Sequence, residues 1–286
     1  MKAASVPAPT YAFPQSRAAQ ITLVLLTVYV IYALTQLDVS LERVGQGLEH
    51  AGRFLGKMIP PNFARSELLW NGLAESLQIA VLASALGIVL ALPFGLLGAR
   101  NLMPSWVSWP ARLVIVVARS FHPVVVAILF VKAVGFGALA GILALTVASI
   151  GFIGKLFTEA IEEVSAKQVE AVRATGAPFT SMLAFGVLPQ VFSRFIGFAT
   201  YQLDSNLRNS TMVGIVGAGG IGGTLFAAFQ RFDYDFVSAI LISIIALIMA
   251  GEVLATAVRR IFIDNATLRQ LFRAGTPAHD RPLDDD

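Results

Sequence analysis

Six long apolar runs constrain this chain more than any other feature of its sequence. Backbone N–H and C=O groups cannot stay unpaired in lipid, so runs of this length are expected to form transmembrane helices. Hydrophobic residues make up 56% of the chain and charged residues 14%, which is typical of a polytopic membrane protein. The sequence therefore predicts an all-α polytopic fold with six transmembrane helices. The runs cover residues 21–37, 68–97, 112–134, 138–157, 182–203 and 236–258.

The polar segments divide the chain into four predicted parts. Residues 1–19 form a flexible cytoplasmic lead, and residues 20–67 hold the first transmembrane helix and an external connection with one amphipathic helix. Residues 68–260 form the core, and residues 261–286 a cytoplasmic tail. No small-residue cleavage pattern follows the first run, so we interpret it as an anchor and not as a signal peptide.

The basic residues predict the orientation. Cytoplasmic loops of membrane proteins carry an excess of Lys and Arg. With six spans, both termini and the connection at residues 158–181 lie in the cytoplasm. The small net charge of +3 then reflects anchoring at the inner leaflet, and no nucleic-acid partner is expected. The residues on this side are Lys2, Arg17, Arg100, Arg112, Lys167, Arg173, Arg259 and Arg260.

The connection after the fourth run has the pattern of a short amphipathic helix at about residues 165–180. Val169 and Val172 alternate with charged positions, Ser165 is a candidate N-cap, and Gly176 can turn the chain at the helix end. Pro189 lies just inside the next run, where it is expected to kink the helix. Periodicity alone equally fits a surface helix that only joins two spans.

Polar side chains inside or beside the runs are candidates for a translocation pathway. Such residues are costly in lipid and usually face a cavity or a partner. Glu75 equally fits the headgroup level, and Arg119 equally fits a structural salt bridge to Glu75; Pro123 should break the helix next to Arg119. The candidates are Glu75, Gln78, Arg119, Ser120, His122, Asn206 and Arg208, with Gly217, Gly219 and Gly220.

The glycine-rich stretch at residues 214–223 is not read as a dinucleotide site. It contains G-x-G-x-x-G, but no strand precedes it, so close packing or a turn that lines a cavity is the better interpretation. Residues 151–156 lack the spacing and the hydroxyl of a phosphate-binding P-loop. The chain is therefore expected to bind no ATP, and no cofactor or metal of its own.

The connection resembles the cytoplasmic "EAA" loop of ABC importer permeases. It matches that pattern at Glu170, Ala171, Gly176, Leu188 and Pro189, and departs from it at Val172 and Gly186. The resemblance implies the type I ABC importer permease fold, in which this loop forms a coupling helix that docks on the ATP-binding subunit. The exposed charges of Glu170 and Arg173 would set the register of that docking.

Residues 206–222 are similar to a segment of the phosphonate-importer permeases, which are related to methionine-importer permeases. Arg119 with Pro123, and residues 98–101, also resemble that group. The resemblance implies a homodimer in a bacterial inner membrane, two ATP-binding subunits that hold ATP and Mg, and an extracytoplasmic solute-binding protein. The solute would be phosphonate, phosphate, phosphite or a related oxyanion.

Other functions remain open at this point. The chain could be a permease for methionine or another small solute. A polytopic membrane enzyme would use His122 and Glu75 as an acid–base pair. A secondary transporter would be expected to show internal repeats, and none is visible in the sequence.

Overall fold

The computed structural model describes residues 17–37 and 40–274, and this part of the chain is helical, without a strand. Most of the predicted lead and the end of the predicted tail lie outside the described residues. The chain forms two units, Met1–Lys57 and Met58–Asp286. The helices are α1 Arg17–Gln36, α2 Leu41–Lys57, α3 Ser66–Gly98, α4 Ser105–Ser120, α5 Pro123–Val134, α6 Ala138–Glu162, α7 Ala166–Ala174, α8 Phe179–Met182, the π-helical turn η1 Leu183–Val187, α9 Leu188–Ile215, α10 Ile221–Gln230 and α11 Tyr234–Ala274.

The first unit holds the predicted anchor and the predicted amphipathic helix. α1 is apolar over its length and long enough to cross a bilayer. In α2, the apolar residues Val44, Leu48 and Leu55 recur at helical spacing, and Glu49 pairs with Arg53 at 3.3 Å on another face.

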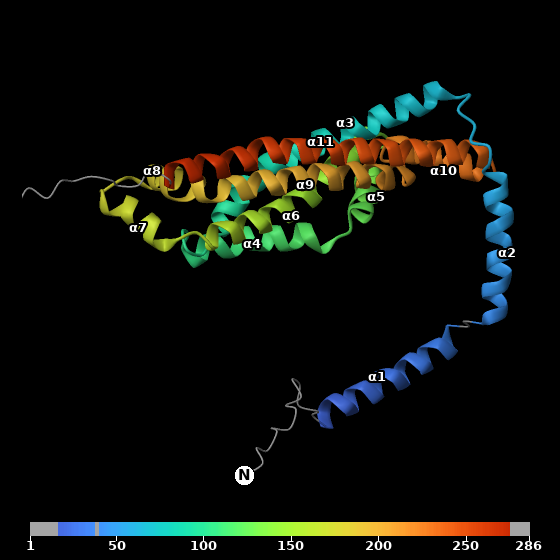
Figure 1. Ribbon diagram of the computed structural model, residues 1–286, viewed down its shortest axis with the longest axis horizontal. Helices are drawn as coiled ribbons and strands as arrows, with labels where there is room; N and C mark the ends of the chain where they lie inside the picture. Colours follow the sequence, from blue (N-terminus) through green and yellow to red (C-terminus); the bar gives the residue numbers. More distant parts are fainter. Residues whose placement is uncertain (1–16, 38–39, 275–286) are drawn as a thin grey trace, which may run out of the picture. The chain divides into compact units, whose positions relative to one another are not determined.

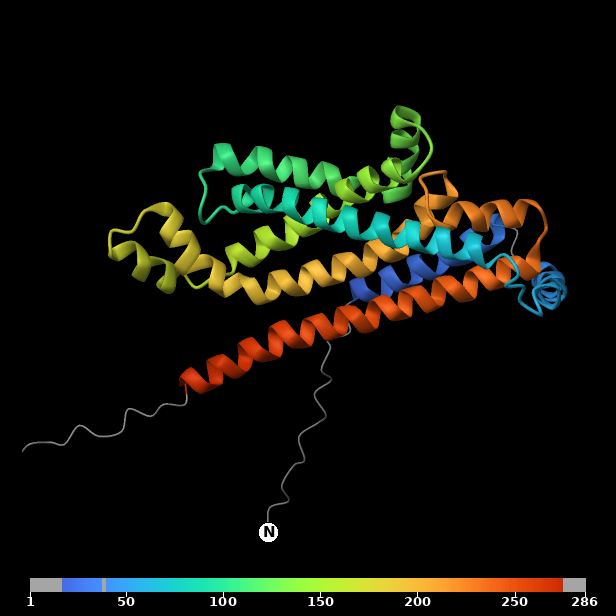
Figure 2. The ribbon, with the colours of Figure 1, turned by 90° about the horizontal axis from the view of Figure 1, so that it is seen from above.

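The six predicted spans are present as helices. Five segments are long and apolar enough to cross a membrane: α1, α3, α6, the continuous segment Phe179–Ile215, and Tyr234–Ala257 of α11. The third predicted span is a bent pair, because α4 and α5 meet at 92° (Figure 2). Pro123 begins α5, so the predicted break beside it is confirmed. The short apolar helix α10 was not expected.

Small residues bring the helices of the second unit close together. In lipid, helices associate by packing, which favours residues that let backbones approach. A Cβ on Gly87 of α3 would lie 2.2 Å from Cβ of Ser149 in α6, and a Cβ on Gly95 would lie 2.7 Å from the Phe157 ring. α3 and α6 therefore pack as one layer, and α9 lies along both (Figure 1).

Candidate functional site

The helix α7 presents charge outward and buries one apolar edge. Glu170, Ala171 and Arg173 are exposed, whereas Val169 is 9% exposed. Val169 packs in a cluster with Met182 and neighbouring apolar residues, including Ile161, Val187 and Val191. In Figure 1, α7 lies at the end of the bundle opposite α10. The outward face is therefore open to another protein while the helix stays anchored to the bundle.

Two contacts from the next segment hold α7 in place. Gly186 of η1 lies against α7, since a Cβ built on it would be in ordinary van der Waals contact with Cα of Val169, at 3.5 Å. Gln190 of α9 accepts a hydrogen bond from the backbone N–H of Ser165 at 2.9 Å and donates one to the carbonyl of Gly186 at 2.6 Å. α7 is thus tied to the start of α9 by both packing and hydrogen bonds.

The carboxyl end of α6, which leads into α7, is fixed to the α3–α4 connection. Glu162 accepts hydrogen bonds from the backbone N–H of Arg100 at 2.8 Å and from the guanidinium of Arg112 at 2.5 Å. Asn101 donates to the carbonyl of Ile161 at 2.8 Å. A force on α7 would therefore reach α3, α4, α6 and α9 together.

The local geometry differs from the sequence prediction in three details. α7 ends at Ala174, and Gly176 then takes φ +76°, so the helix is shorter than 165–180 but turns at the predicted glycine. Ser165 is the N-cap residue, but its side chain makes no capping bond. The irregularity expected at Pro189 is the π-helical turn η1, and Pro189 then sits in the first turn of α9, where no partner for its nitrogen is needed.

Leu188 and Pro189 are exposed at the start of α9. Leu188 lines an apolar cavity of about 210 Å³ together with Leu92, Pro93 and Leu96 of α3. The six predicted coupling residues therefore lie at one end of the bundle, four around α7 and two at the α9 start.

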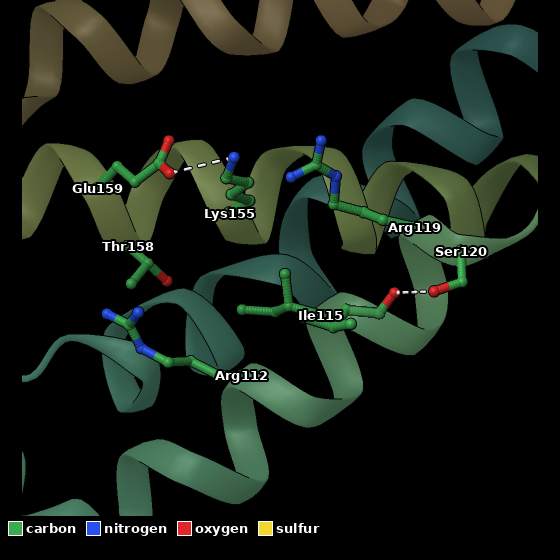
Figure 3. A pocket seen from close by; sticks show the side chains of 8 residues that line it. Arg112, Ile115, Arg119, Ser120, Lys155, Thr158 and Glu159 are labelled. Carbon is green, nitrogen blue, oxygen red and sulfur yellow. Dashed lines mark hydrogen bonds and ion pairs between the residues drawn. The ribbon is translucent and has the colours of Figure 1, made fainter.

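A larger cavity of about 410 Å³ lies between α4 and α6 (Figure 3). Among the predicted pathway residues, Arg119 and Ser120 line it. Arg119 is held where α4 and α6 approach closely, since a Cβ on Gly151 would lie 2.6 Å from Cγ of Arg119. The other lining residues are Arg112, Ile115, Val116, Lys155, Thr158 and Glu159.

The predicted glycines form the turn between α9 and α10. Gly217, Gly219 and Gly220 have φ of +87°, +82° and +82°, a region that other residues rarely adopt. Glu75 of α3 reaches this turn: a Cβ on Gly219 would lie 2.9 Å from Oε1 of Glu75. Ser76 accepts a hydrogen bond from the backbone N–H of Ile221 at 2.9 Å. The stretch is thus a tight turn packed on α3.

Three predicted pathway residues lie elsewhere. Gln78 is exposed on α3. His122 accepts a hydrogen bond at Nδ1 from the backbone N–H of Val124 at 3.3 Å and so caps α5. Arg208 is exposed and pairs with Asp204 at 3.1 Å, one helical turn away. Among the described residues, no ion pair joins Arg119 to Glu75, and no hydrogen bond joins His122 to Glu75.

Asn206 belongs to a buried polar network that the sequence did not reveal. It donates to Ser84 of α3 and Ser149 of α6, both at 2.9 Å, and accepts from Gln202 at 3.0 Å. Gln202 also donates to Ser149 at 2.9 Å. The signal was available in part, because Gln202 and Asn206 are four residues apart and so lie on one face of the helix.

Residues 91–265 match the family described as "Binding-protein-dependent transport system inner membrane component". A phosphate-import permease protein PhnE of Mycolicibacterium smegmatis is 41% identical over 71% of this chain and 38% of its own length. A phosphite transport system permease protein PtxC of Stutzerimonas stutzeri is 38% identical over 76% of this chain and 79% of its own. A probable D-methionine transport system permease protein MetI of Vibrio cholerae is 26% identical over 68% of this chain and 93% of its own length.

Solved structures give the same fold. The inward-facing MetNI methionine ABC transporter, in its native crystal form, aligns with a TM-score of 0.58 and 24% identity over 69% of this chain and 99% of that one. An amino acid ABC transporter with histidines aligns with a TM-score of 0.59 and 20% identity over 70% of this chain and 96% of the matched chain. The predicted type I importer permease fold is confirmed.

Proposed function

Because the chain belongs to the family of binding-protein-dependent transport system inner membrane components, we propose that it is the permease subunit of an ATP-driven importer of phosphorus oxyanions. The names of the relatives support phosphonate, phosphate or phosphite as the solute. The methionine permease relatives are less similar, at 26% identity. The chain is a multi-pass protein of the inner membrane, and the proposed orientation places both termini in the cytoplasm.

The observation that carries the proposal is the anchored, outward-facing helix α7. Glu170 and Arg173 are exposed on it, while Val169 is buried against η1 and α9. Charges on such a helix set the register of a docked partner, and the packed edge transmits its movement. α7 would therefore dock on an ATP-binding subunit, which would hold ATP and Mg, and this chain would supply no cofactor.

The proposed complex contains two copies of this chain, two ATP-binding subunits and an extracytoplasmic solute-binding protein. Closure of the ATP-binding subunits would move both α7 helices, and the bundle would tilt between inward and outward access. The ties from Gln190 and Glu162 support movement of α3, α4, α6 and α9 as one body.

The test is assembly and coupled ATP hydrolysis in lipid discs. Glu170→Ala is expected to weaken binding of the ATP-binding subunit by about tenfold, the effect of about 1.4 kcal/mol at an interface. The matched control is Glu67→Ala, because Glu67 is also exposed but lies in the first turn of α3, at the end of that helix away from α7. Glu67→Ala should bind the ATP-binding subunit like the wild type.

The solute is tested in the same discs with loaded binding protein and a panel of methylphosphonate, phosphate, phosphite and methionine. Stimulation of ATP hydrolysis by a phosphorus oxyanion supports the proposal. Stimulation by methionine alone would reassign the solute. If no ATP-binding subunit assembles with the chain, the permease role itself is wrong.

A further inference from the structure

The cavity between α4 and α6 is lined by more positive than negative charge. Arg112 and Arg119 come from α4, seven residues apart and so on one helix face, and Lys155 and Glu159 come from α6. The hydroxyls of Ser120 and Thr158 complete its polar lining. A volume of about 410 Å³ is in the range of small-ligand sites.

The three cations of this cavity differ in how they are already bound. Arg112 donates to Glu162 and to the carbonyl of Gly98, at 2.5 and 2.8 Å. Lys155 pairs with Glu159 at 3.3 Å, and both side chains are nearly half exposed, at 45% and 47%. Within residues 17–37 and 40–274, Arg119 takes part in no ion pair or side-chain hydrogen bond. The guanidinium of Arg112 is therefore already occupied by contacts within the protein, whereas Arg119 and Lys155 can bind an anion.

Figure 3 shows the ends of Arg119, Lys155 and Glu159 in a row along one edge of the cavity. Arginine binds phosphate-type oxygens through two parallel N–H groups, and lysine acts as a point charge. An exposed ion pair four residues apart on a helix is weak, so a doubly charged anion can displace Glu159 from Lys155.

We propose that Arg119 and Lys155 form a transit site, a weak binding site for an oxyanion of phosphorus on its way through the permease. Glu159 competes with that anion for Lys155. The inference rests on the proposed function and adds the site to it. When the anion is present, Lys155 turns from Glu159 to the anion. When the anion leaves, Lys155 pairs with Glu159 again, which keeps anion binding weak and anion release fast.

The experiment measures binding of methylphosphonate to the permease–ATPase complex, without binding protein, and its uptake into proteoliposomes. Arg119→Met and Lys155→Met should each weaken binding about tenfold, the effect of losing one charge-assisted hydrogen bond. Glu159→Gln should tighten binding about threefold or more, since it removes a competing charge. The double variant Lys155→Met, Glu159→Gln removes both members of the pair and should bind like Lys155→Met.

The control is Arg231→Gln, an exposed arginine at the end of α10, which should bind methylphosphonate like the wild type. In Arg231→Gln, ATP hydrolysis stimulated by loaded binding protein should also stay within about twofold of the wild type, because this position lies outside both the proposed site and α7. Loss of methylphosphonate uptake in Arg119→Met and Lys155→Met, with uptake unchanged in Arg231→Gln, would support the transit site.

Anionic lipid offers the same chemistry as the solute, so the discs are made in two forms, zwitterionic only and with phosphatidic acid. If the cation variants lose bound phosphatidic acid but bind methylphosphonate normally, the site is a lipid site and the inference is overturned. If the wild type imports a phosphorus oxyanion and Arg119→Met imports it equally well, this inference alone fails. If the wild type imports none, the proposed function fails.

Discussion

At the scale of single residues, substitutions at Gly176 and Gly197 distinguish the cost of an unfavourable backbone conformation from the cost of a steric clash. A Cβ on either glycine would meet nothing within 4 Å, but only Gly176 has a positive φ, of +76°. A left-handed conformation costs a residue with a Cβ about 1–2 kcal/mol. We expect Gly176→Ala to lower the opening free energy of the α7–α8 segment by about 1 kcal/mol, measured by amide hydrogen exchange of residues 166–182.

Gly197→Ala is the matched control and should leave exchange in that segment unchanged. Gly176→Asn should fall between the two, because asparagine adopts positive φ more readily than alanine. Equal exchange in Gly176→Ala and Gly197→Ala would show that the turn at Gly176 is not strained by a side chain.

Asn206 tests the contribution of the buried polar network to stability. It makes three side-chain hydrogen bonds, two of them to other helices. Hydrogen bonds between membrane helices contribute about 0.6 kcal/mol each, so Asn206→Leu should lower the free energy of unfolding by about 1–2 kcal/mol. Ser210→Ala should change it little, because Ser210 bonds to Leu207 of its own helix. Unfolding in mixed micelles measures both; unchanged stability of Asn206→Leu would contradict the network's role.

At the scale of the elements, neighbouring glycines of α10 show how closely that helix packs on α9. A Cβ on Gly222 would lie 1.9 Å from the carbonyl oxygen of Thr211, whereas one on Gly223 would have its nearest contact at 3.5 Å. Overpacking costs about 1–3 kcal/mol or more. Gly222→Ala should therefore lower the thermal midpoint by several degrees, about the effect of 2 kcal/mol, and Gly223→Ala should leave it close to wild type. Similar midpoints would mean that α10 can shift.

The elements also show what the sequence could predict. The spans follow from runs of apolar residues, and the break in the third span follows from Pro123, because both are local properties. α10 was missed because its ten residues are too few to cross a bilayer and they follow a glycine-rich turn. The pairing of Lys155 with Glu159 could be predicted from their spacing of four residues. The position of Lys155 near Arg119 could not, because it depends on the register of α4 against α6, where Gly151 lets Arg119 approach closely.

At the scale of the whole molecule, the second unit contains its own apolar core and the polar contacts that join its first residues to its last helix. Its three buried apolar clusters, as far as the chain is described, draw on residues 58–248. The ties of Asn62 to Asp235 and of Arg65 to Asp233 close its start onto α11. The matched solved chain of the methionine transporter is covered almost completely by 69% of this chain. The bundle is therefore expected to keep its fold without residues 1–57.

A protease site inserted after Lys57 tests this without disturbing membrane insertion. After cleavage in detergent, the second unit should remain monodisperse, and its thermal midpoint should change by no more than a peripheral substitution would cause, the equivalent of about 0.5 kcal/mol. The uncut protein with the same insertion is the control for the inserted residues. A fall of many degrees on cleavage would mean that α1 or α2 supports the bundle. The absence of such a fall would show that residues 58–274 hold their fold without support from α1 and α2.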